Sequence, residues 1–206
     1  MGRYQGPVCR FCRVAGAKLF LKGAKCYTNK CPVARRNSRP GQHGKLHQKY
    51  SEYGIRLIEK QRLRRTYGLL EKQFRLYFEK ANKGKGVTGE RLLQMLECRL
   101  DNVVYRMGMA VSRNQARQFV RHGHILVNGR RIDIPSYQVR IGEEVAVLSK
   151  SQEAIRNMVE PFQKPNTPAW LTIDEEALRG KVLSIPRREE IDTNVAENLI
   201  IEYYSR

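Results

Sequence analysis

Positive charge is spread unevenly along this chain, and the first fifty residues constrain the fold most. They contain twelve lysines and arginines and no aspartate or glutamate. Repulsion among so many uncompensated cations opposes compaction of the segment. We therefore expect residues 1–50 to fold fully only beside a dense polyanion.

The excess of positive charge declines along the rest of the chain, whose net charge is +19. Residues 51–100 hold twelve basic and six acidic residues, residues 101–150 eight and four, and residues 151–206 seven and ten. Nucleic acid is the favoured polyanion, because each neutralised phosphate releases condensed counterions. An anionic membrane is disfavoured, because the glycines, prolines and cysteines of residues 1–44 interrupt any amphipathic helix.

The apolar content indicates a folded protein rather than a basic tail. Hydrophobic residues make up 41% of the chain, more than a disordered segment carries. No apolar stretch follows the first residues as in a secretory signal, and no eighteen apolar residues run together. We expect a cytoplasmic protein with reduced cysteines.

Four of the five cysteines fall in the basic segment. Two residues separate Cys9 from Cys12, and four separate Cys26 from Cys31. Four thiolates can enclose one tetrahedral ion, which can contribute about 10–16 kcal/mol to the folding of so small a segment. We predict a metal site, with zinc favoured over an iron–sulfur cluster. The alternatives are an adventitious cluster of cysteines and, less favoured in this compartment, a redox disulfide. Cys98 is expected to be an ordinary core residue.

Helices are predicted after an irregular arm of residues 1–50. Ser51 can cap a first helix that ends at Gly68, and the apolar spacing from Leu70 to Ala81 predicts a second. The polar, glycine-rich segment 82–89 is predicted to join two domains. Apolar residues at helical spacing then predict one long helix from 88 to 107.

The following segment is predicted to form a shorter helix and a small sheet. Ser112 and Gln115 can form a capping box for a helix that ends at Gly123. Residues 124–132 are predicted to form a hairpin around the Asn128-Gly129 turn. Further strands are predicted around Gly142, at 170–173 and at 181–185, before a closing helix over 195–203.

Three arginines, Arg113, Arg117 and Arg121, are spaced along one face of the shorter helix. A solvated face is the usual explanation of such a stripe. However, no acidic residue lies between positions 101 and 133, and guanidinium groups suit phosphates and base edges. We predict that the stripe binds RNA. An exposed arginine supports no core, so Arg117→Glu is expected to weaken RNA binding with little loss of stability.

Two other basic segments are predicted to contact RNA to different extents. Arg130 and Arg131 follow directly after the predicted turn and extend the stripe toward the width of an RNA groove. Arg62 and Arg65 lie in a helix that also carries acidic residues, so only partial phosphate contact is predicted there.

No catalytic site is predicted. Gly84 and Gly89 have the spacing of a phosphate-binding loop, but Glu90-Arg91 stands where Lys-Ser or Lys-Thr is required. The histidines have no carboxylate or serine partner at a suggestive spacing. A zinc-dependent DNA-binding regulator is disfavoured, because the cysteine loop contains no evident recognition helix.

The stretch LECRLDNVVYRMGMAVSRNQARQFVRHGHILVNGRRIDIPSYQVRIGEEV closely resembles the S4 RNA-binding module. Pseudouridine synthases, tyrosyl-tRNA synthetases and a heat-shock protein carry the same module, so an enzyme with an accessory S4 module is the alternative. That alternative leaves few residues for an active site. RPGQHG, YGIRLIEKQRLRRTYGLLEKQFRLYF and ENLIIEYYSR are similar to the bacterial ribosomal protein S4 family. The cysteine arm resembles that of its metal-binding subset.

The resemblance implies an α+β fold with a metal-binding arm over residues 1–50. It implies an all-helical domain over 51–90, joined by the returning segment 186–206. The S4 module, with two helices and a small, mostly antiparallel sheet, is implied as an insertion over 91–185 together with a β-rich segment.

The resemblance also implies a structural constituent of the small ribosomal subunit rather than an enzyme. Such proteins bind the five-prime domain of small-subunit ribosomal RNA and nucleate its assembly. They lie near the channel through which messenger RNA enters, beside two neighbouring ribosomal proteins, and they influence translational accuracy. Some can help to unwind messenger RNA, and some repress their own operon.

The residues predicted to contact RNA are mostly cations of the arm and of the module. By the resemblance, Lys45 and Lys49 are expected on the messenger side. The full set is Arg3, Arg10, Arg13, Lys18, Lys22, Lys25, Lys30, Arg35, Arg36, Arg39, Gln42, His43, Lys45, Lys49, Arg62, Arg65, Arg113, Arg117, Arg121, Arg130 and Arg131.

Overall fold

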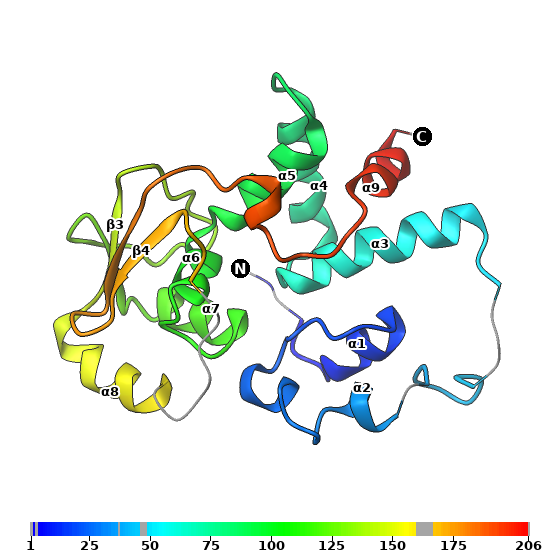
Figure 1. The fold of residues 1–206 in the computed structure, drawn as a ribbon, viewed down its shortest axis with the longest axis horizontal. Coiled ribbons are helices and arrows are strands. Elements are labelled where there is room, and N and C mark those ends of the chain that lie inside the picture. Colours follow the sequence, from blue (N-terminus) through cyan, green and yellow to red (C-terminus); the bar gives the residue numbers. More distant parts are fainter. Residues whose placement is uncertain (1, 3, 37, 46–48, 160–166, 206) are drawn as a thin grey trace. The chain divides into compact units, whose positions relative to one another are not determined.

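The computed structural model describes the chain except residues 1, 3, 37, 46–48, 160–166 and 206 (Figure 1). The chain divides into two compact units. Unit 1 comprises Met1–Leu92 and Thr193–Arg206, and unit 2 comprises Leu93–Asp192. Unit 1 is helical, whereas unit 2 combines helices with an antiparallel sheet, so the fold class is α+β as predicted.

The arm at the start of unit 1 contains short helices, so the prediction of an irregular segment was wrong in part. These are α1 (Cys9–Ala15), the 3-10 helix η1 (Gly23–Cys26) and α2 (Pro32–Arg35). Gly16 ends α1 in the left-handed region at φ 65°, and its N–H donates to the carbonyl of Cys12. The buried Cys12, Ala15 and Leu19 form a small core between these helices.

The helices that follow the arm match the predicted positions. In α3 (Glu52–Thr66) the Ser51 hydroxyl accepts a hydrogen bond of 3.2 Å from the N–H of Gly54. In α4 (Glu71–Asn82) the predicted apolar stripe is buried from Phe74 to Ala81, whereas its first member, Leu70, precedes the helix and is exposed. Both helices begin with a glutamate, which suits the positive end of the helix dipole.

The C-terminal helix α9 (Glu197–Tyr204) lies beside α3, far away in the sequence (Figure 1). Arg56 Nε donates to Glu202 Oε2 at 2.6 Å, and the rings of Tyr53 and Tyr203 lie 5.6 Å apart. The returning segment therefore completes unit 1.

The single long helix predicted from 88 to 107 is two helices, α5 (Thr88–Glu97) and α6 (Leu100–Arg106). Between them Arg99 is extended, with φ −69° and ψ 137°, and forms a β-bridge with Gln138. The N–H of Leu100 donates to the carbonyl of Tyr137 at 2.9 Å. Long-range backbone bonds therefore interrupt the helix where the local apolar spacing predicts continuity.

The predicted joint at 82–89 lies within unit 1, and the division between the units falls inside α5 instead. Gly89 explains the difference. A Cβ atom at this position would come within 2.7 Å of Glu197 Cβ, so the first turn of α5 approaches α9 closely. The start of α5 therefore packs within unit 1.

Unit 2 is built on a five-stranded antiparallel sheet in the order β2-β1-β3-β5-β4. The strands are β1 (Ile125–Val127), β2 (Arg130–Arg131), β3 (Glu144–Val147), β4 (Leu171–Asp174) and β5 (Arg179–Val182). Asn128 and Gly129 make the predicted tight turn, with φ 48° and φ 75°. The strand predicted before Gly142 is only the bridge at Gln138.

Besides the sheet, unit 2 contains the helices α6, α7 (Arg113–Arg121) and α8 (Ser149–Val159). The 3-10 helix η2 (Arg188–Glu190) follows the last strand in the sequence. The core of unit 2 contains Val104, Val120, Val145 and Trp170. Helix α8 was not predicted, because only Ile155 and Val159 are buried in it and its apolar signal is weak.

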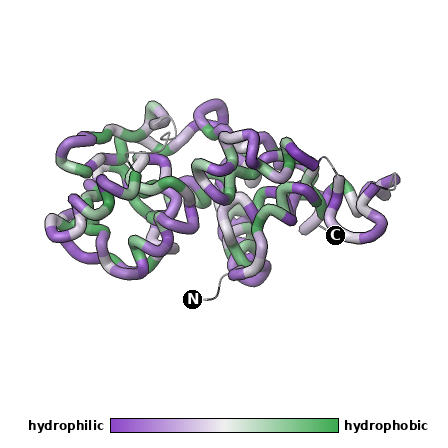
Figure 2. The backbone as a smooth tube through the Cα atoms, turned by 90° about the horizontal axis from the view of Figure 1, so that it is seen from below, coloured by the Kyte–Doolittle hydropathy of each residue, from purple (hydrophilic) through white to green (hydrophobic). Residues whose placement is uncertain are grey.

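Hydropathy alternates over short stretches of the backbone (Figure 2). Among the described residues, no helix has the length and apolar character needed to cross a membrane.

Candidate nucleic-acid interface

Helix α7 carries the predicted arginine stripe, and its three members differ in exposure. The helix begins as predicted, because the Ser112 hydroxyl accepts a hydrogen bond from the N–H of Gln115 at 3.3 Å. Arg121 is exposed, Arg113 is half-buried and Arg117 is buried. The stripe is therefore not a uniform solvated surface.

The prediction that Arg117 is exposed and without a local partner was wrong. Arg117 Nη1 lies 3.1 Å from Asp101 Oδ2, and Arg99 donates to both oxygens of the same carboxylate. The break between α5 and α6 places Asp101 in the first turn of α6, which packs against α7. The stretch of sequence without acidic residues begins directly after Asp101. The partner of Arg117 therefore lies sixteen residues before it, just outside that stretch.

A second buried polar group supports Arg113, and sequence reasoning missed it. Asn102 Nδ2 donates to Glu97 Oε2 at 2.7 Å, and its Oδ1 accepts from Arg113 Nε at 2.8 Å. Arg106 holds the Glu97 carboxylate through Nε and Nη2, each at 3.0 Å. The Arg113 guanidinium also lies over the Tyr105 ring, 4.6 Å from its centre. Arg113 is therefore held in one place.

Polar residues placed among the apolar residues of α6 were the available sequence signal for this group. Every residue of α6, polar or apolar, is buried. Burial of charged groups requires paired partners, which a sequence pattern does not identify.

Three exposed cations of unit 2 lie at the end of α7 and on β2. Arg130 and Arg131 are exposed and lie on β2, at an edge of the sheet. Arg131 Nη2 donates to the carbonyl of His122 at 3.0 Å, which ties the strand to the end of α7. Arg121 lies 3.7 Å from the exposed Asp133, a weak surface pair. We call Arg121, Arg130 and Arg131 the α7–β2 surface.

Most predicted RNA-contacting residues of the arm are exposed. These are Arg10, Lys18, Lys22, Lys25, Lys30, Arg35, Arg36, Gln42, His43, Lys45 and Lys49. Arg3 lies outside the described residues. The exposed set is a cationic surface of unit 1, with no described carboxylate in the arm to offset it.

Two other predicted arm residues, Arg13 and Arg39, bind the arm to itself. Arg13 Nε donates to the carbonyl of Ser38 at 2.8 Å, and Arg39 Nη2 donates to that of Val14 at 3.4 Å. The Arg39 guanidinium also lies 4.9 Å from the centre of the Tyr50 ring. These contacts shape the arm.

Arg62 and Arg65 join α3 to the arm. Arg62 Nη2 donates to the carbonyl of Ala15 at 3.1 Å, and the Arg65 guanidinium stacks 4.5 Å from the centre of the Phe11 ring. Burial lowers the pKa of Arg65, and the neighbouring Arg64 acts in the same direction. Their packing roles are additional to the predicted phosphate contacts.

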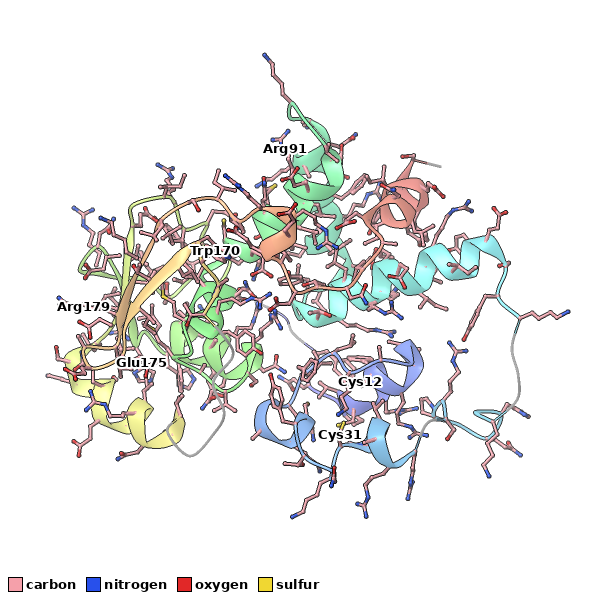
Figure 3. The ribbon with its side chains drawn as sticks, in the orientation of Figure 1. Cys12, Cys31, Arg91, Trp170, Glu175 and Arg179 are labelled. Carbon is pink, nitrogen blue, oxygen red and sulfur yellow. The ribbon has the colours of Figure 1, made fainter. Side chains whose placement is uncertain are left out.

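The four cysteines of the arm line one small cavity of about 10 Å³. Cys12, Cys26 and Cys31 are buried, Cys9 is half-buried, and all four are free thiols. Figure 3 shows Cys12 and Cys31 close together between α1 and α2. The N–H of Lys22 donates to Cys26 Sγ at 3.4 Å. Burial raises the pKa of both Cys12 and Cys26.

Whether these thiols fit an ion depends on their chemistry and spacing. After burial, the neighbouring Cys26, Cys9 and Cys31 also raise the pKa of Cys12. Within the described part of the chain, no three histidine, cysteine or acidic side chains have the arrangement of a metal site. The donor set fits a soft ion, although the sulfurs are not arranged around one.

The fold and these surfaces define a basic protein with an arm-bearing helical unit and an S4-type unit. Residues 3–97 match the family described as Ribosomal protein S4/S9 N-terminal domain, and residues 98–145 match the S4 domain. Small ribosomal subunit protein uS4 is 59% identical to this chain in Dictyoglomus thermophilum, 60% in Dictyoglomus turgidum and 57% in Acetivibrio thermocellus. Each comparison covers the whole of both chains. The chain belongs to the uS4 family of small ribosomal subunit proteins.

Proposed function

We propose that this protein is a structural constituent of the small ribosomal subunit that binds small-subunit ribosomal RNA in the cytoplasm. Its relatives are small ribosomal subunit proteins over their full length. The arm carries exposed cations and no acidic residue in its sequence, and exposed arginines form the α7–β2 surface. Both features suit a phosphate backbone.

The observation that carries the proposal is the fixed geometry around α7. Arg117 and Arg113 are held by Asp101 and Asn102, and Arg131 is bonded to the end of α7, so hydrogen bonds tie the elements that carry Arg121, Arg130 and Arg131 to the rest of unit 2. A cation that is already held, as Arg131 is by the carbonyl of His122, loses less conformational entropy on binding, and a planar guanidinium group can donate to two phosphate oxygens at once. Folded RNA is recognised largely by shape and backbone contacts, which this surface can make.

The arm would bind ribosomal RNA through exposed residues on a small core. Its small core and internal arginine bonds leave eleven predicted contact residues exposed. We infer that it folds fully against the five-prime domain of the ribosomal RNA and so nucleates assembly of that domain. Lys45 and Lys49 would face messenger RNA near the channel through which it enters. Contacts with neighbouring ribosomal proteins there would influence translational accuracy.

Cys9, Cys12, Cys26 and Cys31 would hold one zinc ion, or one iron–sulfur cluster. The bound group would supply a cross-link between α1, η1 and α2, with no role in a reaction. The shared cavity and the backbone N–H bonded to Cys26 support this assignment. An ion would also offset the repulsion among the ionised sulfurs.

Direct binding measurements test the proposal. The full chain should bind a transcript of the five-prime domain more tightly than duplex DNA of equal length, measured by filter binding at one stated salt concentration. Equal affinity for the two polymers would contradict recognition of folded RNA and favour non-specific charge attraction.

A further inference from the structure

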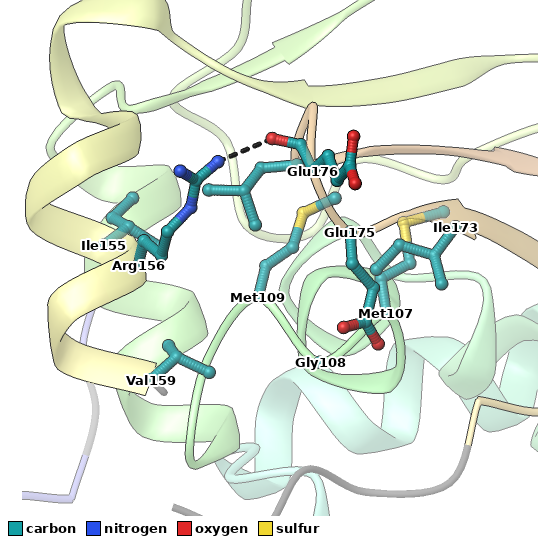
Figure 4. A pocket seen from close by; sticks show the side chains of 10 residues that line it. Met107, Gly108, Met109, Ile155, Arg156, Val159, Ile173, Glu175 and Glu176 are labelled. Carbon is teal, nitrogen blue, oxygen red and sulfur yellow. Dashed lines mark hydrogen bonds between the residues drawn. The ribbon is translucent and has the colours of Figure 1, made fainter. Parts of the chain in front are cut away.

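Unit 2 contains a groove away from the α7–β2 surface, with a volume of about 520 Å³ (Figure 4). Its lining residues come from α8, from the turn after α6 and from the end of the β4–β5 hairpin. They are Met107, Gly108, Met109, Ile155, Arg156, Val159, Ile173, Glu175, Glu176 and Leu178. The volume lies within the range of sites that bury several apolar groups.

The floor of the groove is apolar and adaptable. Met107 and Met109 are each 1% exposed, and Ile155 is 2% exposed. Methionine side chains are flexible and polarisable, so they adjust to apolar groups of different shapes. The floor therefore suits an aliphatic side chain rather than a sugar or a phosphate.

The rim of the groove carries negative charge, whereas the chain as a whole is strongly positive. In Figure 4, Glu175 and Glu176 lie on the side of the groove opposite α8. Both are exposed, and they belong to the one region of the chain, residues 151–206, in which acidic residues outnumber basic ones. Among the described lining residues the one cation is Arg156, which donates from Nη2 to the carbonyl of Glu176 at 2.6 Å and so bridges α8 to the hairpin.

We propose that this groove binds a basic segment of a partner protein that presents an aliphatic side chain next to lysine or arginine. Charge complementarity carries the choice of occupant, because two exposed carboxylates beside an apolar floor attract such a segment and repel RNA phosphates. The proposal rests on the proposed function in one respect, because a ribosomal particle would supply the basic partner proteins.

The test follows the methionine methyl groups of the full chain by NMR. The protein is labelled with ¹³C at the methionine methyls, and the Met107 and Met109 signals are assigned by leucine substitution. The probes are the peptides acetyl-Lys-Leu-Lys-Lys-Leu-Lys-amide and acetyl-Glu-Leu-Glu-Glu-Leu-Glu-amide. The basic peptide should shift the Met107 and Met109 signals, and the acidic peptide, which can bind the cationic arm, should leave them in place.

Charge reversal provides the second arm of the experiment. Glu175→Lys with Glu176→Lys should weaken binding of the basic peptide by about fivefold or more. The matched control is Glu144→Lys with Glu189→Lys, which makes the same change in net charge at exposed positions outside the groove lining. This control should bind the basic peptide like the parent protein.

Four results would overturn the proposal. These are no shift with either peptide, equal shifts with both, shifts of the same methyls by ribosomal RNA, and shifts that depend on protein concentration alone, which would assign the groove to a second copy. RNA affinity of the same variants separates this proposal from the proposed function. Loss of peptide binding with unchanged RNA affinity supports the groove, whereas failure of RNA binding in the parent protein concerns only the proposed function.

Discussion

Arg117 Nη1 and Asp101 Oδ2 lie 3.1 Å apart, with 11% and 7% of their side chains exposed. An arginine that stripe spacing assigns to the RNA surface is thus part of the interior of unit 2. Because Asp101 also accepts two hydrogen bonds from Arg99, the three side chains form one buried charged group.

Replacing Arg117 should therefore destabilise the fold, contrary to the expectation drawn from spacing. Arg117→Ala removes one of the two arginine partners of the buried Asp101 carboxylate, and Arg99 remains as the other. We therefore expect a loss of about 1–3 kcal/mol in the free energy of unfolding. Arg117→Glu should cost more, because it places a second carboxylate beside Asp101. Urea denaturation measures both.

The exposed Arg121 is the matched control on the same helix. Arg121→Ala should change the free energy of unfolding by no more than about 0.5 kcal/mol. Equal stability of the Arg117 and Arg121 variants would show that the buried pair contributes nothing to the fold.

Neutralising the α7–β2 surface should change RNA binding without changing stability. Arg130→Ala removes an exposed cation, so the slope of log affinity against log salt should fall by about one for each phosphate that the variant no longer neutralises. Filter binding over a salt series measures the slope.

Arg179 offers a comparison for this measurement, because it is an exposed arginine of the same unit that lies 3.3 Å from Asp174. Arg179→Ala should leave the salt slope unchanged. An unchanged slope in Arg130→Ala as well would exclude that residue from the RNA interface.

Removing the proposed ion should unfold the arm selectively. Purified protein should contain one zinc, or the iron and sulfide of one cluster, per chain by elemental analysis. Chelation, or Cys26→Ser, should then expose residues 1–50 to protease while unit 2 resists, because the arm has only a small core of its own.

Cys98→Ser is the control for this experiment, since Cys98 lies outside the cysteine cavity. It should leave metal content unchanged. Protein that contains neither zinc nor iron, yet keeps a protease-resistant arm, would contradict the metal assignment.

Cys98 should react slowly with alkylating reagents. Burial, with a smaller contribution from Glu97, raises the pKa of its thiol from 9.0 to about 11. At about pH 8 its thiolate fraction is then roughly 100-fold below that of an ordinary cysteine, and alkylation should slow in proportion. Peptide mapping by mass spectrometry reports Cys98 separately from the other thiols.

The same pKa difference has a defined effect on stability. Because the folded pKa is raised, the contribution of Cys98 is complete below about pH 9 and is lost as the pH rises toward 11. The parent protein should therefore lose more stability than Cys98→Ala over this interval. Parallel pH curves for the two proteins would show that the thiol ionises equally in both states.

Local patterns predicted much of the fold. The cap at Ser51, the apolar face of α4 and the Asn128-Gly129 turn depend on neighbouring residues, so the sequence shows them directly. The break at Arg99 depends on backbone bonds to residues near position 138, which no local period reveals. Likewise, α8 buries too few apolar residues to produce a clear stripe.

The composition of the sequence predicted where the exposed cations of the candidate site lie, but it did not predict which side chains the buried arginines pair with. Unbalanced cations indicated the exposed arm, and most of its predicted residues are indeed exposed. Pairing of Arg117 with Asp101, and of Arg113 with Asn102, depends on how α6 and α7 pack. Spacing places residues on a helix face, whereas the partner helix decides whether that face is buried.

The pairing of α3 with α9 also sets an order of events during synthesis. Arg56 and Glu202 are 146 residues apart, and all of unit 2 is translated between them. At about 5–20 residues per second, α3 waits roughly 7–30 s for its partner after leaving the exit tunnel. The inserted unit can thus mature first, and a nascent chain that stalls before α9 leaves the face of α3 uncovered for chaperones and proteases.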